Sequence, residues 1–235
     1  MVPEHTPGQD PLPDAIAEAL RTSHRHLGVS KGRAMRYLAD IAPFASIAEN
    51  SEQAVRDLCD VMTAGEHLYV MGDRPPDVTG LHWNGIVACL QMLYPSDREI
   101  PGPDSRIPIV RLDCSNAEEM LELITVAFPG YFRIATCRMG NYYGVRQNGQ
   151  LIAMGGERLI VGRYREISGL CTRPGHTGKG LATALLFRIL RDQRASGAIS
   201  WLHVGETNRH AIDLYHHLGF ETLRRVELHR MAREG

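Results

Sequence analysis

The sequence predicts an α/β protein in which a mixed, mostly antiparallel sheet is flanked by helices. Two strand-like segments, 142–147 and 150–160, flank Asn148-Gly149, which is the strongest short signal for a β-hairpin. A third strand-like segment, 166–172, runs through a glycine-rich turn into an apolar helical pattern. The elements expected after it are a helix over 180–195, a strand over 199–204, a helix over 208–218 and a last strand over 226–230. A hairpin followed by a strand–helix–strand unit predicts a sheet of mixed direction.

A proline-rich segment divides the chain. Residues 96–108 contain three prolines and little apolar periodicity, which is typical of a linker. We therefore predict two domains, 1–105 and 106–235. The elements expected in the first are helices over 13–27 and 51–64 and strands over 67–71 and 86–93. This first domain is predicted to be a small α/β unit.

The second domain is expected to begin with a strand over 109–112 and a helix. Ser115 and Glu118 have the spacing of a capping box, which favours a helix start at that point. The apolar residues expected on the buried side of this helix are Met120, Leu121, Ile124 and Phe128.

Composition narrows the class of protein. The chain has 235 residues, 43% hydrophobic and 23% charged, with a formal net charge of −1. A near-neutral chain gives no electrostatic basis for binding nucleic acid or an anionic membrane. Its apolar runs are shorter than the roughly 20 residues of a membrane span, and the N-terminus lacks the features of a signal peptide. We expect a cytoplasmic protein, either a monomer or a homodimer.

The cysteines and histidines give no metal signal. The five cysteines form no C-x-x-C pair, and their odd number fits a reducing compartment, so we expect all five to be core residues. The closely spaced histidines, His24 with His26 and His216 with His217, lack companion ligands at metal-binding spacing. No metal is predicted.

The glycine-rich turn before the helix predicts a site for a pyrophosphate. Gly178 and Gly180 allow backbone N–H groups to point at one anion at the positive end of a helix. A Walker loop is excluded because Gly180 follows Lys179 and Arg173 stands where the first glycine is required. A dinucleotide-binding fingerprint would need glycine at Thr183.

A third template fits better. The segment Thr177-Gly178-Lys179-Gly180-Leu181-Ala182 resembles the coenzyme A loop of the GNAT N-acetyltransferases, Gln/Arg-x-x-Gly-x-Gly/Ala, at all but its first position. The strand-like segments on either side and the later N-x-x-A-I-x-L-Y-x-x-L-G-F pattern resemble the same superfamily. The resemblance covers about residues 107–235, and the nearest branch has a glycine-N-acyltransferase-like C-terminal domain. The N-terminal domain is then interpreted either as a separate unit or as a degenerate copy of the GNAT fold.

The resemblance implies that acetyl-CoA is the cofactor. Its pantetheine arm would lie between two diverging strands, and its pyrophosphate would lie on the glycine loop. The cofactor-binding residues implied are Leu170, Cys171, Thr172, Thr177, Gly178, Lys179, Gly180, Leu181, Ala182, Thr183 and Asn208. Leu170 N–H would polarise the thioester carbonyl, an oxyanion-hole role. Asn208 is also an ordinary helix N-cap, and Cys171 is expected to be packed rather than nucleophilic.

Two residues are candidates for the catalytic proton transfers. Glu166 lies at the interval before Gly180 at which related histone acetyltransferases place their general base, although a glutamate at a strand start is commonly just solvated. Tyr215 matches the family tyrosine that protonates the thiolate of coenzyme A; the alternative is a tyrosine packed on an amphipathic helix.

The sequence leaves two points open: the acceptor, and the residue that supplies the positive charge of the glycine loop. Thr177 replaces the usual Arg or Gln, and the candidates to supply its charge are Arg173, His176 and Lys179. The aromatic residues that could shape an acceptor pocket, or simply pack in the core, are Tyr131, Phe132, Tyr142 and Tyr143. We expect an N-acetyltransferase acting on a small amine or amino-acid-like acceptor by direct attack in a ternary complex. The alternative is a non-catalytic acyl-CoA-binding or regulatory module.

Overall fold

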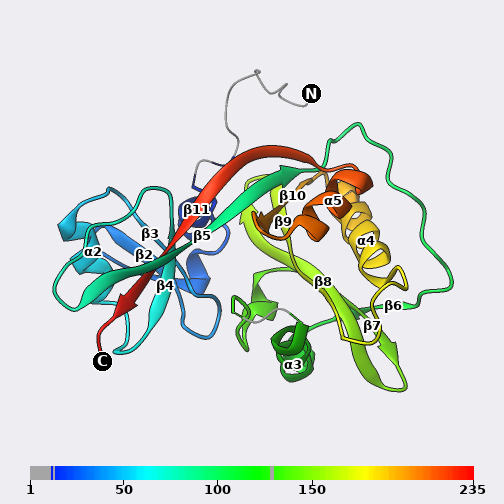
Figure 1. Ribbon diagram of the computed structural model, residues 1–235, viewed down its shortest axis with the longest axis horizontal. Coiled ribbons are helices and arrows are strands. Elements are labelled where there is room, and N and C mark those ends of the chain that lie inside the picture. The colour runs from blue at the N-terminus through cyan, green and yellow to red at the C-terminus, as the bar shows by residue number, and fades with distance from the viewer. Residues whose placement is uncertain (1–11, 13, 128–129) are drawn as a thin grey trace.

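One continuous sheet runs through the whole molecule (Figure 1). The computed structural model describes residues 12, 14–127 and 130–235. Its helices are α1 (Ala15–Arg21), α2 (Glu52–Cys59), α3 (Ala117–Ala127), α4 (Leu181–Ala195) and α5 (Arg209–Leu218), with the 3-10 turns η1 (Arg25–Leu27), η2 (Cys114–Asn116) and η3 (Thr136–Met139). Its strands are β1 (Gly28–Lys31), β2 (Ala34–Tyr37), β3 (Phe44–Ile47), β4 (His67–Met71), β5 (Leu81–Leu93), β6 (Ile109–Leu112), β7 (Tyr142–Gln147), β8 (Gln150–Val161), β9 (Tyr164–Thr172), β10 (Ile199–Gly205) and β11 (Glu221–Arg233).

The strand order joins two halves of the chain. It is β1-β2-β3-β4-β11-β5-β10-β9-β8-β7-β6, so the last strand of each half lies beside a strand of the other. β5 pairs with β10, and β11 pairs with β4. β5 and β11 also pair with each other along most of their length. We call residues 12–93 the N-terminal half and residues 109–233 the C-terminal half. The predicted division near residue 105 stays a prediction, because the sheet continues across it.

The two halves repeat one arrangement. In each, antiparallel strands lead to a parallel pair connected by a helix: β3–α2–β4 in the N-terminal half and β9–α4–β10 in the C-terminal half. This repetition supports the interpretation of the N-terminal half as a degenerate copy. The predicted mixed, mostly antiparallel sheet flanked by helices is confirmed.

Local signals placed the central elements well and the long strands less well. The hairpin turn has positive φ at Asn148 (52°) and Gly149 (80°), as the predicted turn requires. β5 begins at Leu81 and β11 spans Glu221–Arg233, so both are longer than predicted. Their extra length comes from pairing with each other across the molecule, which no local pattern shows.

The predicted helix over 13–27 is wrong beyond Arg21. The chain turns there because His24 is buried between the two halves: its Nδ1 lies 2.9 Å from the Tyr37 hydroxyl and its Nε2 lies 3.1 Å from the Met139 carbonyl. The predicted cap at Ser115 is also wrong. Asp113 caps η2 together with Asn116, and α3 follows from Ala117. Phe128 lies outside the described residues.

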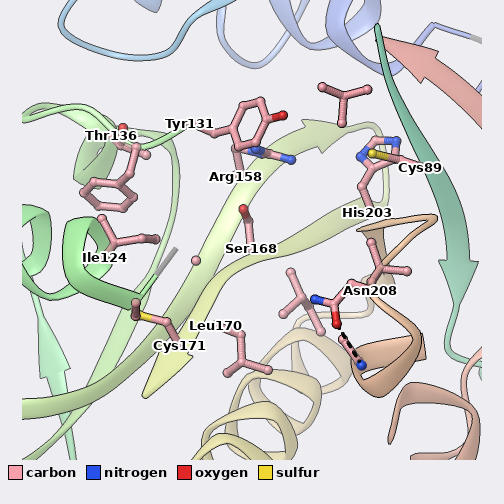
Figure 2. A pocket seen from close by; sticks show the side chains of 18 of the residues that line it. Cys89, Ile124, Tyr131, Thr136, Arg158, Ser168, Leu170, Cys171, His203 and Asn208 are labelled. Carbon is pink, nitrogen blue, oxygen red and sulfur yellow. Dashed lines mark hydrogen bonds between the residues drawn. The ribbon is translucent and has the colours of Figure 1, made fainter. Parts of the chain in front are cut away.

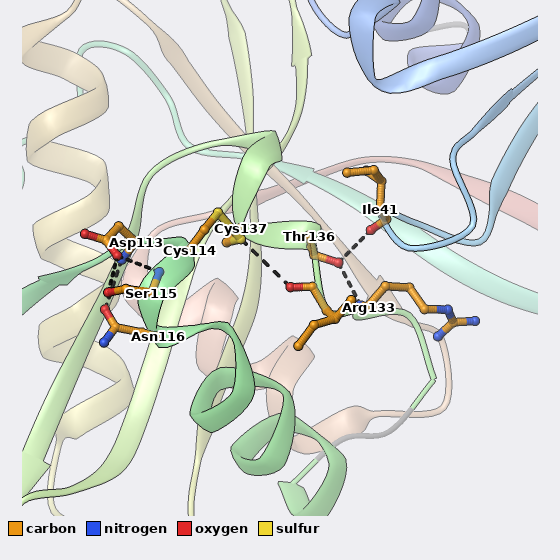
Figure 3. Close-up of a disulfide and its surroundings, with 9 residues drawn as sticks. Ile41, Asp113, Cys114, Ser115, Asn116, Arg133, Thr136 and Cys137 are labelled. Atoms are coloured by element: carbon orange, nitrogen blue, oxygen red, sulfur yellow. Dashed lines mark hydrogen bonds between the residues drawn. A yellow bond between two sulfur atoms is a disulfide. The ribbon is translucent and has the colours of Figure 1, made fainter.

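Two of the cysteines are paired, contrary to the expectation of five free core residues. Cys114 and Cys137 form a disulfide that ties η2, just before α3, to η3 (Figure 3). In the same turn, the Thr136 hydroxyl donates to the Ile41 carbonyl of the N-terminal half at 2.6 Å. A separation of 23 residues carries no sequence signal for pairing, which explains why the disulfide was missed.

No helix within the described ranges is long and apolar enough to cross a membrane. Within the same ranges, no group of three or more metal-ligating side chains gathers.

Candidate functional site

The parallel strands β9 and β10 separate part-way along their length. They pair from Tyr164 with Ile199 to Ile167 with Leu202, and then β9 continues along β8 while β10 continues along β5. The gap opens into a cavity of ≈ 330 Å³ (Figure 2). Its walls include residues 168–172 of β9 and 203–205 of β10, which places Leu170, Cys171 and Thr172 where the cofactor arm is expected.

A bulge in β9 shapes the wall of this cavity. Gly156 pairs with Ser168 and Met154 with Cys171, so Gly155 alone faces both Gly169 and Leu170. Gly169 has φ of 64°, a conformation that glycine adopts without strain. A bulge changes the direction of the backbone. Leu170, the predicted oxyanion donor, therefore lies outside the regular strand pairing that its neighbours make.

The glycine loop leaves a helix end open. Gly178 and Gly180 both have φ of 74°, and an added Cβ at either would meet open space. Gly180 is the N-cap of α4, no side chain caps this helix, and its first turn has no acidic residue. The N–H groups of Leu181, Ala182 and Thr183 in that turn therefore lie at a positive helix end that suits an anion.

The three candidate loop charges differ in their surroundings. Arg173 pairs with Glu122 at 3.0 Å, and its Nε donates to the Leu151 carbonyl. His176 is half-buried, whereas Lys179 is exposed beside Thr177 and forms no ion pair with any described residue. Lys179 is the candidate best placed to meet a phosphate.

Asn208 and Tyr215 come from α5 and its cap. Asn208 accepts from Ala211 N–H at 3.2 Å through its Oδ1, so both predicted roles are compatible: its side chain caps α5 and also lines the cavity. Tyr215 lines the cavity and packs edge-on against Phe220. Burial raises the pKa of Tyr215 to about 12, so its hydroxyl holds its proton at neutral pH.

Glu166 lies beneath the cavity and not in its wall. The carboxylate is fully buried, and two nitrogens of Arg158 donate to it, at 2.8 Å from Nε and 2.5 Å from Nη2. His203 Nδ1 lies 2.8 Å from its Oε1. Burial alone would raise the pKa of Glu166, but the charge and hydrogen bonds of Arg158, with the hydrogen bond of His203, lower it to about 2.

A chain of hydrogen bonds fixes the orientation of His203. Arg224 Nε donates to Gln91 Oε1 at 2.9 Å, which leaves the Gln91 amide nitrogen to face His203 Nε2 at 3.2 Å. His203 Nε2 is then the acceptor, and Nδ1–H donates to Glu166. Unlike Glu166, both His203 and Arg158 line the cavity.

The far wall of the cavity comes partly from the N-terminal half. Phe44 of β3 and the β5 residues Val87 and Cys89 line it, beside Tyr131. The ring of Tyr131 stacks on Phe44 with ring centres 6.0 Å apart. Of the predicted aromatic residues, Tyr131 and Phe132 line the cavity, whereas Tyr142 is a core residue and Tyr143 packs under Arg188.

The sequence did not single out Arg158 or His203. Each lies within an apolar strand, and a charged or ionisable residue at such a position is the one signal that could have found it. Cys171, by contrast, lies where it was expected. Burial raises its pKa to about 12, so the thiol is a poor nucleophile at neutral pH.

Comparison with known proteins agrees with this geometry. The family description "Acetyltransferase (GNAT) family" matches residues 113–220. Residues 113–220 are therefore similar to the GNAT acetyltransferases. Members of this family transfer acyl groups from acetyl-CoA, so the match supports a transferase activity with that donor. No curated protein matches the sequence.

Solved structures extend the likeness to the whole chain. A protein assigned to the GNAT family, from Novosphingobium aromaticivorans, superposes with a TM-score of 0.85 at 29% identity, over 97% of this chain and 100% of that one. A GCN5-related N-acetyltransferase from Kribbella flavida gives 0.58 at 16% identity, over 93% and 96%. A tandem GNAT protein from the clavulanic acid biosynthesis pathway gives 0.54 at 17% identity, over 86% and 78%, and these last two show the fold alone. The predicted GNAT fold is therefore confirmed.

Proposed function

We propose that this protein transfers the acetyl group of acetyl-CoA to the amine of a small molecule, which attacks the thioester directly in a ternary complex. The observation that carries the proposal is the divergence of β9 and β10 beside an uncapped, glycine-rich helix end. A slot for an extended arm and a site for its pyrophosphate then occur side by side.

The slot and the loop divide the cofactor between them. Backbone groups of Leu170, Cys171 and Thr172 would pair with the pantetheine amides, and the Asn208 amide would reach the same arm. The loop from Thr177 to Thr183 would hold the pyrophosphate through backbone N–H groups, with Lys179 in place of the usual Arg or Gln.

Two donors act on the reacting thioester. The bulge at Gly169 supports Leu170 N–H as the group that stabilises the developing oxyanion. Tyr215 would then donate its proton to the departing thiolate. Its hydroxyl stays protonated at neutral pH, so it is available as a proton donor in every turnover.

The amine must lose a proton before it attacks. Glu166 was predicted as the base, and we propose that it serves this role through His203. The carboxylate holds Nδ1–H of the imidazole, which directs the other ring nitrogen to accept a proton. Among the described residues, only the Gln91 amide lies within hydrogen-bond distance of this nitrogen, at 3.2 Å, so a substrate amine or a water could replace that contact.

The acceptor is proposed from the sequence resemblance. The glycine-N-acyltransferase-like branch suggests an amino-acid-like amine, and the cavity of ≈ 330 Å³ suits a small molecule. The oligomeric state, monomer or homodimer, stays a prediction.

Release of free thiol from acetyl-CoA, measured with and without a panel of amines, tests the function. The wild type should release thiol only with an amine present, and the reaction should yield the N-acetyl product. Tight binding of acetyl-CoA with no amine-dependent release would favour the non-catalytic alternative. Binding of ATP or NAD in preference to coenzyme A would overturn the cofactor proposal.

A further inference from the structure

One arginine supplies the permanent charge in the described wall of the cavity. Among the described residues that line it, Arg158 is the only one that carries a permanent charge, and no aspartate or glutamate lines it. Figure 2 shows the guanidinium beside Tyr131, inside the cavity. The charge of Glu166 raises the pKa of Arg158 despite burial, so the guanidinium stays positive.

Arg158 also keeps hydrogen-bonding capacity. Glu166 accepts from its Nε and Nη2, while Nη1 makes no hydrogen bond to any described residue. Arg36 of the N-terminal half, which pairs with Glu66, shows the contrast. Its Nε, Nη1 and Nη2 all donate, to the Tyr37 and Val61 carbonyls and to Glu66. The nitrogens of Arg36 therefore all serve the fold, whereas Arg158 lines the cavity and keeps Nη1 available to a ligand.

We infer that the acceptor is an amino carboxylate whose carboxylate is bound by Arg158. This inference rests on the proposed function and names its substrate class. Guanidinium and carboxylate form charge-assisted hydrogen bonds, and Glu166 holds the guanidinium in place for them. The remaining wall, with Phe44, Val87 and Phe132, is apolar and suits an apolar side chain.

The same charge disfavours other amines. A polyamine or an aminoglycoside carries further cations, and this wall offers no carboxylate to receive them. The Arg158 guanidinium would repel such an acceptor at short range. An uncharged amine would bind without repulsion but would leave the Nη1 donor unpaired.

Matched acceptors test the inference. The rate constant kcat/KM is measured for L-phenylalanine and 2-phenylethylamine and for L-leucine and isopentylamine, with spermidine as the polycation. The wild type should prefer each amino acid over its decarboxylated partner, and the double variant Arg158→Gln/Glu166→Gln should lower that preference at least about tenfold. Both enzymes meet the same amines, so the change in preference is independent of amine pKa. Arg158→Lys should retain part of the preference, and Arg36→Lys should leave it unchanged.

The outcomes separate this inference from the proposed function. Efficient acetylation of the decarboxylated amines or spermidine, with no effect of Arg158 on the preference, would overturn the inference and leave the function standing. If no amine is acetylated, calorimetry of the coenzyme A-loaded protein with N-acetyl-L-phenylalanine and N-(2-phenylethyl)acetamide decides. Binding of the carboxylated ligand alone, lost in the double variant, would support the carboxylate site although the transferase proposal failed. Equal binding, or none, would overturn the inference as well.

Discussion

The described strands form two parallel pairs, and only one of them has a connecting helix that no side chain caps. In β9–α4–β10 the loop before the helix has glycines at 178 and 180, and no side chain caps the helix. In β3–α2–β4 no glycine precedes the helix, and the Ser51 hydroxyl caps it by accepting from Ala54 N–H. The same topology therefore leaves a helix start uncapped in one half and satisfies its own backbone in the other.

The two strand–helix–strand crossovers, β3–α2–β4 and β9–α4–β10, also differ in the charged residues near the start of the helix. Glu49 and Glu52 flank the N-cap of α2, where they would repel a phosphate, whereas Lys179 precedes α4. α2 has 8 residues and α4 has 15. Under the proposed function, the residues of the loop, and not the strand–helix–strand arrangement, determine where the pyrophosphate binds.

Each half contains an Arg–Glu pair, Arg36–Glu66 in one and Arg158–Glu166 in the other. Removing the Glu166 carboxylate should have the largest effect on stability. Glu166→Gln should lower the free energy of unfolding by about 3–5 kcal/mol, because it leaves the charge of Arg158 buried without compensation. Glu66→Gln should lower it less, since Arg36 keeps its hydrogen bonds to the Tyr37 and Val61 carbonyls when the carboxylate is lost. Denaturant unfolding of both variants measures this, and equal losses would mean that the two pairs do not differ.

The contacts of His24 with Tyr37 and Met139, which join the two halves, should make the free energy of unfolding depend on pH. Burial lowers the pKa of His24 to about 4 from a usual 6.5. The unfolded chain then binds the proton more readily, so stability is complete above about pH 6.5 and falls as the pH drops toward 4, by on the order of 3 kcal/mol. Unfolding curves between pH 7 and pH 5 measure most of this slope before Glu166 begins to contribute. His24→Gln should flatten it and His210→Gln, at an exposed position, should not; an unchanged slope in His24→Gln would assign it to another group.

Tyr215→Phe should lower kcat about 100-fold, since it removes the proposed acid, and should leave the KM for acetyl-CoA nearly unchanged. Tyr94→Phe is the control, because Tyr94 also packs edge-on against Phe220 but does not line the cavity. Steady-state kinetics of the two variants distinguish the roles. Equal rates for both would remove Tyr215 from the proposed mechanism.

The smallest expected effect separates backbone strain from ligand binding. Gly178 and Gly197 both have φ of 74° with open space at the Cβ position, but only Gly178 belongs to the loop. Alanine at either should destabilise the fold by about 1–2 kcal/mol. Only Gly178→Ala should also weaken acetyl-CoA binding, by about tenfold, as measured by calorimetry. A similar loss of affinity in Gly197→Ala would show that the loop plays no special part.

The sequence predicted the fold of the C-terminal half because its signals are local. The Asn148-Gly149 turn and the glycines around α4 act through their own φ angles. The exchange of β5 and β11 between the halves depends on pairing over more than a hundred residues, which local patterns do not carry. The cavity wall formed by Phe44 and Arg158 was missed for the same reason, since the two meet only in the folded chain, with the guanidinium carbon 4.8 Å from the ring centre.

A crystal structure with bound coenzyme A tests the central claim most directly. The pantetheine arm should lie between residues 168–172 and 203–205, with the pyrophosphate on Gly178 and Gly180 at the start of α4. The loop before α2 should be empty. Coenzyme A bound at the β3–α2–β4 crossover, or its phosphates placed away from α4, would contradict the account.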